Sequence, residues 1–278
     1  QVMNITDVGH LTDDDTADAG GEDKVAAQAR AERTDPFQIT QRYTDMFLED
    51  MAALGVREPK ERPKATEYID EMVAMVESLI ESGHAYRVGD NVYFDVTTFE
   101  EFGAPSGTRV VDLAAGSRVE VNDEKRHPAD FALWKSDPAH LMKWQTVFGE
   151  HGFPGWHIEC SAMAKATLGD RIDIHTGGED NVFPHHECEI AQSACANGVP
   201  LANFWMHAKF LQVDGGKMSK SLGNVYTVPD VVERGFEPRH LRFALIRGHY
   251  RTQINFTWAI MEEIRARLDN LDEIAVLL

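Results

Sequence analysis

The sequence predicts an α/β protein built on a doubly wound, parallel β-sheet. Strand-like and helical segments alternate through the second half of the chain, from Arg171 to Arg247. A glycine pair, Gly177–Gly178, follows one of these strand-like segments directly. Strands that alternate with helices are typical of parallel sheets covered by helices, and a glycine-rich turn after a strand belongs to the same class. A stretch of weak periodicity before this half indicates an inserted subdomain, and the C-terminal segment is helical.

Composition and charge narrow the class of protein further. Of the 278 residues, 43% are apolar, and 27 basic against 46 acidic residues give a net charge of −19, which argues against a broad nucleic-acid surface. Three cysteines in so long a chain exclude a disulfide framework. No apolar run approaches the ~20 residues of a membrane helix, and no secretory signal opens the chain. We therefore expect a cytoplasmic protein with no membrane partner.

The first part of the chain predicts a strand end, a loop and a helix. Residues 2–7 read as the tail of a strand, so we expect a fragment cut at its beginning. Residues 10–24 are rich in Asp, Gly and Thr and are expected to form an exposed, mobile loop. An apolar stripe predicts a helix over 66–82, with Thr66 as its N-cap and Gly83 as its stop. The stripe consists of Ile69, Met72, Val73, Val76, Leu79 and Ile80.

A hairpin and an irregular stretch follow this helix. Residues 85–88 and 92–94 alternate like strands and are separated by Gly-Asp-Asn, which predicts a tight turn. Residues 95–154 show weak periodicity and no repeat, so we interpret them as part of the insertion.

The second half returns to regular alternation. Its predicted strands are 171–175 and 204–213, and its predicted helices are 184–195, 229–233, 238–247 and a segment from Thr257 onward with Met261, Ile264, Leu268 and Leu271 on one stripe. The last helices indicate the beginning of an all-helical part.

Cys160 and the segment 184–189 offer side chains that ligate metals. His185 and Glu189 are four residues apart, so on a helix they lie one above the other on the same face. Together with the Cys160 thiolate they give a sulfur, nitrogen and oxygen set that zinc accepts. The alternative is a polar helix surface beside a small buried cysteine, but the density of Cys and His favours the metal. Cys188 can either compete for the metal or pack against the next turn.

The loop 214–221 carries two lysines, Lys217 and Lys220, beside small hydroxyl residues. Mobile positive charge next to hydroxyl and backbone donors can close over a polyphosphate and stabilise charge that develops on phosphorus. The glycine spacing of a Walker motif is absent. A solvated lysine pair is the ordinary alternative, and the specificity of the five-residue run argues against it.

The turn 175–180 follows a predicted strand and contains Gly177, Gly178 and Asp180. Glycines there allow a nucleotide to approach the backbone, and an acidic side chain can accept from ribose hydroxyls. Alone this signal is weak, because Gly-Gly pairs are common in ordinary turns.

Several of these segments resemble one family of enzymes. Lys217-Met218-Ser219-Lys220-Ser221 matches, residue for residue, the second signature of class I aminoacyl-tRNA synthetases. Further segments are similar to the cysteinyl-tRNA synthetases within that class. They are 155–163 (GWHIECSAM), 183–187 (FPHHE), 4–7 (NITD), 205–207 (WMH) and 248–251 (GHYR). The similarity runs in one register over nearly the whole chain.

The resemblance implies a role for each matching residue. Cys160, His185 and Glu189 correspond to three of the family's four zinc ligands. The fourth ligand, a cysteine, and the first signature, His-Ile-Gly-His, would lie upstream of Gln1. Thr6 and Trp156 would line the cysteine pocket. Lys220 would contact the ATP phosphates with Lys217 as its helper, and Met218, Ser219 and Ser221 would also bind ATP. The nucleotide-binding turn would consist of Gly177, Gly178 and Asp180. Thr176, Glu179 and Cys188 depart from the residues usual in the family.

The same resemblance implies a Rossmann-like catalytic core and a reaction. Residues 1–235 would be the catalytic domain, truncated at its N-terminus and interrupted by an insertion at roughly 64–154. Residues 236–278 would be the start of a helical stem, and the anticodon-binding part that follows it in the family would be absent. The enzyme would activate L-cysteine with ATP and Mg²⁺ and transfer it to tRNA(Cys), with one Zn²⁺ per chain recognising the cysteine thiolate. Cysteine differs from serine mainly in sulfur for oxygen, and zinc exploits that difference in softness. The isolated fragment is expected to be inactive.

Two other functions stay open. A related ligase of mycothiol synthesis activates cysteine similarly but transfers it to an amino sugar. Glu189 and the run 190–192 (IAQ) favour the synthetase. A non-catalytic, truncated paralogue that binds zinc or RNA is the second alternative, and the reading frame upstream of Gln1 would decide it.

Overall fold

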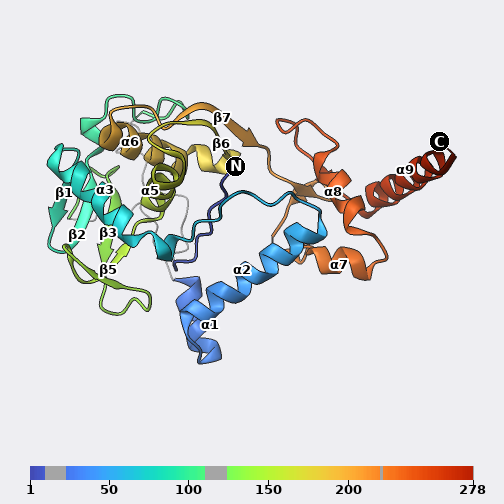
Figure 1. Cartoon of the computed structure of the whole chain (residues 1–278), viewed down its shortest axis with the longest axis horizontal. Coiled ribbons are helices and arrows are strands. Elements are labelled where there is room, and N and C mark those ends of the chain that lie inside the picture. The colour runs from blue at the N-terminus through green and yellow to red at the C-terminus, as the bar shows by residue number, and fades with distance from the viewer. Residues whose placement is uncertain (10–22, 110–123, 220–221, 278) are drawn as a thin grey trace. The chain divides into compact units, whose positions relative to one another are not determined.

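The computed structural model describes residues 1–9, 23–109, 124–219 and 222–277 (Figure 1). The chain forms two compact units. Unit 1 comprises Gln1–Thr44, Pro59–His175 and Asp180–Met206, and unit 2 comprises Asp45–Glu58, Thr176–Glu179 and His207–Leu278. Most of the loop predicted over 10–24, together with Lys220 and Ser221 of the lysine loop, lies outside the described residues.

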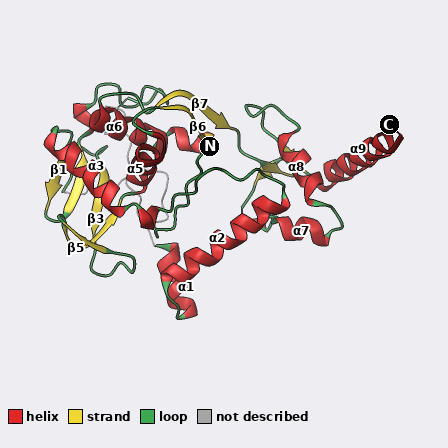
Figure 2. Ribbon diagram, in the orientation of Figure 1, coloured by secondary structure: helices red, strands yellow, loops and turns green. Residues whose placement is uncertain are grey.

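Helices and strands alternate along the described chain, which confirms the α/β class (Figure 2). From the N-terminus to Pro154 the elements are α1 (Lys24–Glu32), α2 (Pro36–Ala53), η1 (Ala65–Glu67), α3 (Ile69–Glu81), β1 (Ala85–Val88), β2 (Asn91–Phe94), η2 (Val96–Thr98), β3 (Phe131–Ser136), β4 (Trp144–Thr146) and β5 (Gly149–Pro154). The later elements are α5 (Trp156–Leu168), β6 (Ile172–Gly178), η3 (Glu179–Val182), α6 (His185–Asn197), β7 (Ala202–Ala208), β8 (Gln212–Val213), β9 (Gly216–Lys217), α7 (Val228–Glu233), α8 (Pro238–Ile246), β10 (Asn255–Phe256) and α9 (Trp258–Leu277).

A five-stranded antiparallel sheet occupies the stretch that the sequence assigned to the insertion. Its order is β1-β2-β3-β5-β4. The predicted hairpin is confirmed as β1 and β2, with Tyr86 opposite Tyr93. Strands β3 to β5 were not predicted. The first four residues of β3 are all buried, so the strand lacks the alternation that marks a sheet with one solvated face.

Helix α3 lies next to this sheet and carries the predicted apolar stripe into the core of unit 1 (Figure 1). Met72, Val76 and Leu79 are completely buried. Thr66 is not the N-cap of α3, because it lies in the preceding turn η1. Its backbone N–H and its hydroxyl both donate to the Asp7 carboxylate, at 2.9 and 2.6 Å. A carboxylate distant in sequence therefore organises the approach to this helix.

Helices α5 and α6 pack against each other beside α3 (Figure 1). Helix α6 agrees closely with the helix predicted over 184–195, whereas α5 was not predicted. Polar and apolar residues of α5 are buried together, among them His157, Ile158, Glu159 and Ser161. A helix enclosed on most sides shows no polar–apolar period for a sequence pattern to reveal.

The succession β6, α6, β7 is the strand–helix–strand unit expected of a doubly wound sheet. Parallel pairing is found among the described residues. Val2 pairs with Glu61 and Ile5 with Lys64 as isolated bridges, and β8 pairs with β10. The extended segment at the N-terminus thus agrees with the predicted strand tail. The strand predicted over 204–213 is divided into β7 and β8.

Unit 2 encloses a smaller core formed by its short sheet and the helices α7, α8 and α9 (Figure 2). Met261 and Ile264 of the predicted C-terminal stripe are buried in it, but Leu271 is 55% exposed. No helix within the described ranges combines the length and apolar character that a membrane span requires. The domain boundary at residue 235 stays a prediction.

Candidate metal and substrate site

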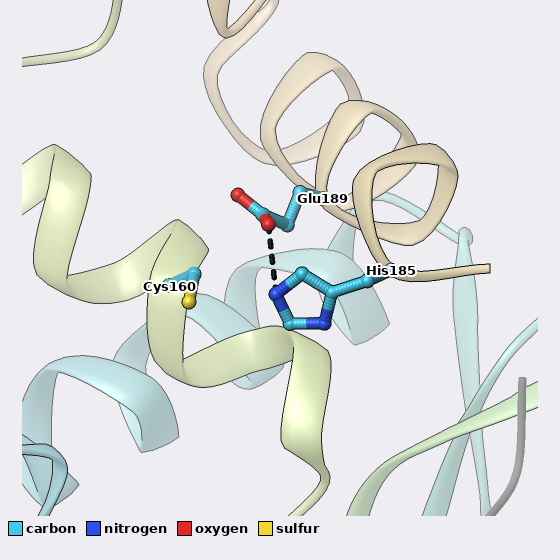
Figure 3. Close-up of side chains that lie close together, drawn as sticks. All are labelled: Cys160, His185 and Glu189. Atoms are coloured by element: carbon cyan, nitrogen blue, oxygen red, sulfur yellow. Dashed lines mark ion pairs between the residues drawn. The ribbon is translucent and has the colours of Figure 1, made fainter. Parts of the chain in front are cut away.

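Helices α5 and α6 bring Cys160, His185 and Glu189 together (Figure 3). Their candidate ligand atoms all lie within 4.8 Å of one another. Cys160 comes from α5, while His185 and Glu189 lie one turn apart on α6, as their spacing predicts. Cys160 is partly buried and Glu189 is completely buried.

The Glu189 carboxylate is the centre of this group. His185 Nε2 lies 2.9 Å from Oε1 and His175 Nε2 lies 3.1 Å from Oε2. Neither contact is aligned as a hydrogen bond, so both oxygens are buried without a hydrogen-bond donor among the described residues. Burial alone would raise the pKa of Glu189, but the two imidazoles outweigh it and hold the pKa below its usual value. A buried carboxylate whose oxygens lack donors fits a cation as its partner.

Cys160 completes a donor set of sulfur, nitrogen and oxygen. Its Sγ accepts a hydrogen bond from Asn4 Nδ2 at 3.5 Å. Burial, and secondly the negative charges of Glu189 and Glu159, raise the pKa of this thiol well above its usual value. A metal ion binds the deprotonated thiolate form of cysteine, so metal binding would release the proton of the Cys160 thiol. The three side chains fit Zn²⁺ by chemistry and by spacing.

Aromatic and imidazole rings surround the group. The Trp156 ring centroid lies 4.3 Å from that of His185. His157 Nδ1 lies 2.9 Å from His185 Nδ1, so one of these nitrogens donates and the other accepts. Thr6 Oγ1 accepts from Asn4 Nδ2, the same amide group that donates to Cys160. Thr6 and Trp156 are therefore both near the candidate ligands.

Sequence reasoning gave no role to His175 and His186, which form a second possible ligand group with Glu189. Both imidazoles also lie against Trp205, with centroid distances of 4.8 and 4.9 Å. Glu189 raises the pKa of His175 against the opposing effect of burial. In the sequence, only their positions could have indicated these two histidines as candidate ligands. His175 lies in a strand just before the Gly-Gly turn, and His186 follows His185.

Cys188 packs in the apolar core of unit 1 and is completely buried. Of the two possibilities that the sequence left open, the structure favours packing. Cys188 belongs to neither group of candidate ligands found among the described residues.

The lysine loop lies in unit 2, where Lys217 is exposed in β9 and Met218 packs against the core. Asn224 holds this part of the loop in place. Its Nδ2 donates to the Lys217 carbonyl at 3.0 Å, and its Oδ1 accepts from the Ser219 N–H at 2.8 Å. Sequence reasoning missed this asparagine, because an isolated Asn after a loop carries no distinctive pattern.

The glycine turn ends β6, with Gly177 and Gly178 as the last strand residues and Asp180 exposed in η3. Glu179 forms an ion pair with Lys209 and accepts from the Phe210 N–H at 3.1 Å. These two contacts lower the pKa of Glu179. Glu179, which departs from the residue usual in the family, is therefore stabilised by contacts with residues near it in the fold.

Comparison with known proteins gives concordant matches. The family described as "tRNA synthetases class I (C) catalytic domain" matches residues 4–266. A cysteine–tRNA ligase of Chlorobaculum tepidum is 52% identical over 274 residues, covering 98% of this chain and 55% of that protein. One of Salinibacter ruber is 49% identical over 276 residues, covering 92% of this chain and 53% of that protein. The chain thus spans about half the length of these curated relatives.

A solved structure shares the fold. The methionyl-tRNA synthetase of Mycobacterium tuberculosis, in complex with methionyl-adenylate, superposes with a TM-score of 0.63 at 14% identity, over 96% of this chain and 67% of that one. At this identity the similarity supports the Rossmann-like synthetase fold alone.

Proposed function

The chain belongs to the family of class I tRNA synthetase (C) catalytic domains, and from this premise we propose that the protein carrying it is a cysteine–tRNA ligase. The observation that carries the proposal is the convergence of Cys160, His185 and Glu189 from two helices. A sulfur-containing ligand set beside Trp156 and Thr6 suits a substrate that is itself a thiol. The substrates would be ATP with Mg²⁺, L-cysteine and tRNA(Cys).

Each candidate residue would contribute binding or positioning. Zn²⁺ held by Cys160, His185 and Glu189 would supply a soft ligand position for the substrate thiolate, which a serine hydroxyl fills poorly. Trp156 would exclude water beside this position, and Thr6 would line the pocket. A site built to bind one particular substrate group strongly rejects an analogue that lacks this group. Discrimination against serine, which lacks the thiol, would therefore need no editing site.

The activation step needs no nucleophile from the protein. A cysteine carboxylate oxygen attacks the α-phosphorus of ATP, the bond to the bridging oxygen breaks, and pyrophosphate leaves with its electron pair. In the second step a ribose hydroxyl at the tRNA terminus attacks the carbonyl carbon of the cysteinyl-adenylate and loses its proton to solvent. The bond from that carbon to the phosphate oxygen breaks, and AMP leaves with its electron pair. Catalysis is then positioning and charge stabilisation, for which Lys217 and Lys220 are suited and to which Gly177, Gly178 and Asp180 would add nucleotide binding.

The function is tested with protein expressed from the complete reading frame. We expect cysteine-dependent exchange of pyrophosphate into ATP, no exchange with serine, and transfer of cysteine to tRNA(Cys). Activation without transfer to tRNA, but with transfer to an amino sugar, would instead indicate a ligase of the mycothiol type. Absence of both activation and transfer would refute the proposal and favour a non-catalytic paralogue.

Lys217→Ala is expected to lower kcat of pyrophosphate exchange by about 100-fold, because one preorganised cationic donor to a transition state is worth about 10²–10³ in rate. The KM for cysteine should stay near its wild-type value, since the lysine loop contributes to phosphate chemistry. Single-turnover formation of the adenylate measures the effect. Lys60→Ala, which removes a solvent-exposed lysine that forms an ion pair with Glu61, is the matched control. Equal rates for the two variants would contradict the assignment.

A further inference from the structure

We propose that the buried hydrogen bond between Ser161 and Gln192 positions the candidate metal ligands by fixing how α5 lies against α6. Ser161 Oγ donates to Gln192 Oε1 at 2.7 Å, and both residues are completely buried. Ser161 directly follows Cys160, and Gln192 lies three residues after Glu189, on the same side of its helix. The inference rests on the metal assignment made above.

The ligand set depends on the spacing of these two helices. Cys160 belongs to α5, and His185 and Glu189 belong to α6, so any slide or separation changes the distance from Sγ to the other two donors. Zinc sites tolerate little change of this kind, since ligand distances in them are narrowly defined.

Apolar packing alone fixes this spacing weakly. Small residues, Ala162 on α5 with Cys188 and Ala191 on α6, contribute to the buried core here. Apolar burial stabilises contact without a preferred direction, whereas a hydrogen bond constrains distance and angle. The Ser161–Gln192 bond is a directional contact between the helices made by side chains that are not candidate ligands themselves.

Gln192 depends on Ser161 for its orientation. The Gln192 Nε2 group is buried and has no hydrogen-bond partner within the described ranges. Its amide is therefore held through Oε1, and removal of the serine hydroxyl would leave the whole amide buried without a partner. Such a loss is costly, so the two residues must be replaced together to separate positioning from stability.

The test variant combines Ser161→Ala with Gln192→Met. Replacing both partners by apolar groups of similar volume keeps the packing and leaves no unsatisfied polar atom, so folding stability should change little. We expect the zinc dissociation constant, measured by chelator competition on the complete protein, to rise about 10-fold, which is the lower end of the range for residues that hydrogen-bond to metal ligands directly. The visible spectrum of the Co²⁺-substituted protein should change as well.

A matched control is available on the same two helices. Lys165 Nζ donates to Asn197 Oδ1 at 2.7 Å, also joining α5 to α6 but at an exposed position five residues beyond Cys160. Lys165→Met with Asn197→Ala should leave the zinc dissociation constant and the Co²⁺ spectrum unchanged.

The outcomes separate this inference from the proposed function. Wild-type zinc affinity and an unchanged Co²⁺ spectrum in the Ser161/Gln192 double variant would overturn the positioning role. Absence of zinc binding by the wild-type protein would overturn the metal assignment, and this inference with it. If the double variant does not fold, Gln192→Asn decides by the same two readouts, because it keeps an amide but withdraws it from Ser161 by one methylene.

Discussion

His185→Ala is expected to weaken zinc binding by the complete protein at least about 100-fold. The imidazole supplies one of three candidate ligand atoms lying within 4.8 Å, and even the outer partners of metal ligands are worth about 10–100-fold in affinity. The substitution also leaves the Glu189 Oε1 atom buried without the neighbouring imidazole, which adds a desolvation penalty. Metal content after dialysis and chelator competition measure the loss.

Cysteine activation should decline with the metal. If zinc ligation recognises the substrate thiol, kcat/KM for cysteine in pyrophosphate exchange falls by a similar factor in His185→Ala, while the KM for ATP changes little. His185→Cys keeps a zinc ligand on the same helix and should recover part of the affinity. His151→Ala, which removes a partly buried imidazole from the first half of β5, is the control and should behave as wild type. Full zinc occupancy in His185→Ala would remove the basis of the metal assignment.

Periodic segments of the sequence predicted their structures well. The stripe Met72, Val76 and Leu79 is buried as α3, and the hairpin at 85–94 forms, although its turn is shorter than predicted because Asn91 already pairs with Val88 in β2. Helix α3 has one buried and one solvated face, so its pattern of side chains records the structure directly. The spacing of His185 and Glu189 predicted their contact for the same reason, because both lie on one helix. The hairpin is indicated instead by its β-branched and aromatic residues and by the turn residues between them, because β2 is almost wholly buried.

Buried elements and long-range contacts were not predictable in this way. The first half of helix α5 and the first four residues of strand β3 are almost wholly buried, so their sequences show no solvated face. Cys160 contacts Asn4, 156 residues earlier in the chain, and His157 contacts His185 from the neighbouring helix. No local period specifies such contacts. The density of Cys and His residues and the family resemblance both indicated Cys160 as a ligand, and only the structure shows which imidazoles surround it.

A second large effect is expected at Asp130, which directly precedes β3 of the five-stranded sheet and is completely buried. Its Oδ2 accepts from the Tyr86 hydroxyl at 2.7 Å and from the His127 N–H at 3.0 Å, and its Oδ1 accepts from the Val96 N–H at 3.0 Å. One carboxylate thus joins β1, the turn η2 and the segment before β3. The Tyr86 Oη in turn accepts from the Arg126 N–H at 2.7 Å.

Asp130→Ala is expected to lower the free energy of unfolding by about 3–5 kcal/mol. Three donors lose their acceptor at once, and each buried donor left unsatisfied costs about 1–3 kcal/mol. Tyr86→Phe removes only one of these donors and should cost about 1 kcal/mol. The double variant should lose less free energy of unfolding than the two single variants together. In it the tyrosine hydroxyl is absent, so it cannot be left buried without an acceptor.

Urea-induced unfolding measures these differences, with an unchanged m-value showing that the denatured state is the same. Asp137→Ala is the matched control: Asp137 is an exposed residue in the same part of the chain, and its carboxylate accepts from the Ala139 N–H at 2.8 Å. Its loss should cost less than about 1 kcal/mol, because water replaces the acceptor at an exposed turn. A cost at Asp130 no greater than that at Asp137 would mean that the three buried donors find other acceptors. The sheet would then be held by apolar packing of Phe94, Phe131 and Trp134, and the carboxylate would be replaceable.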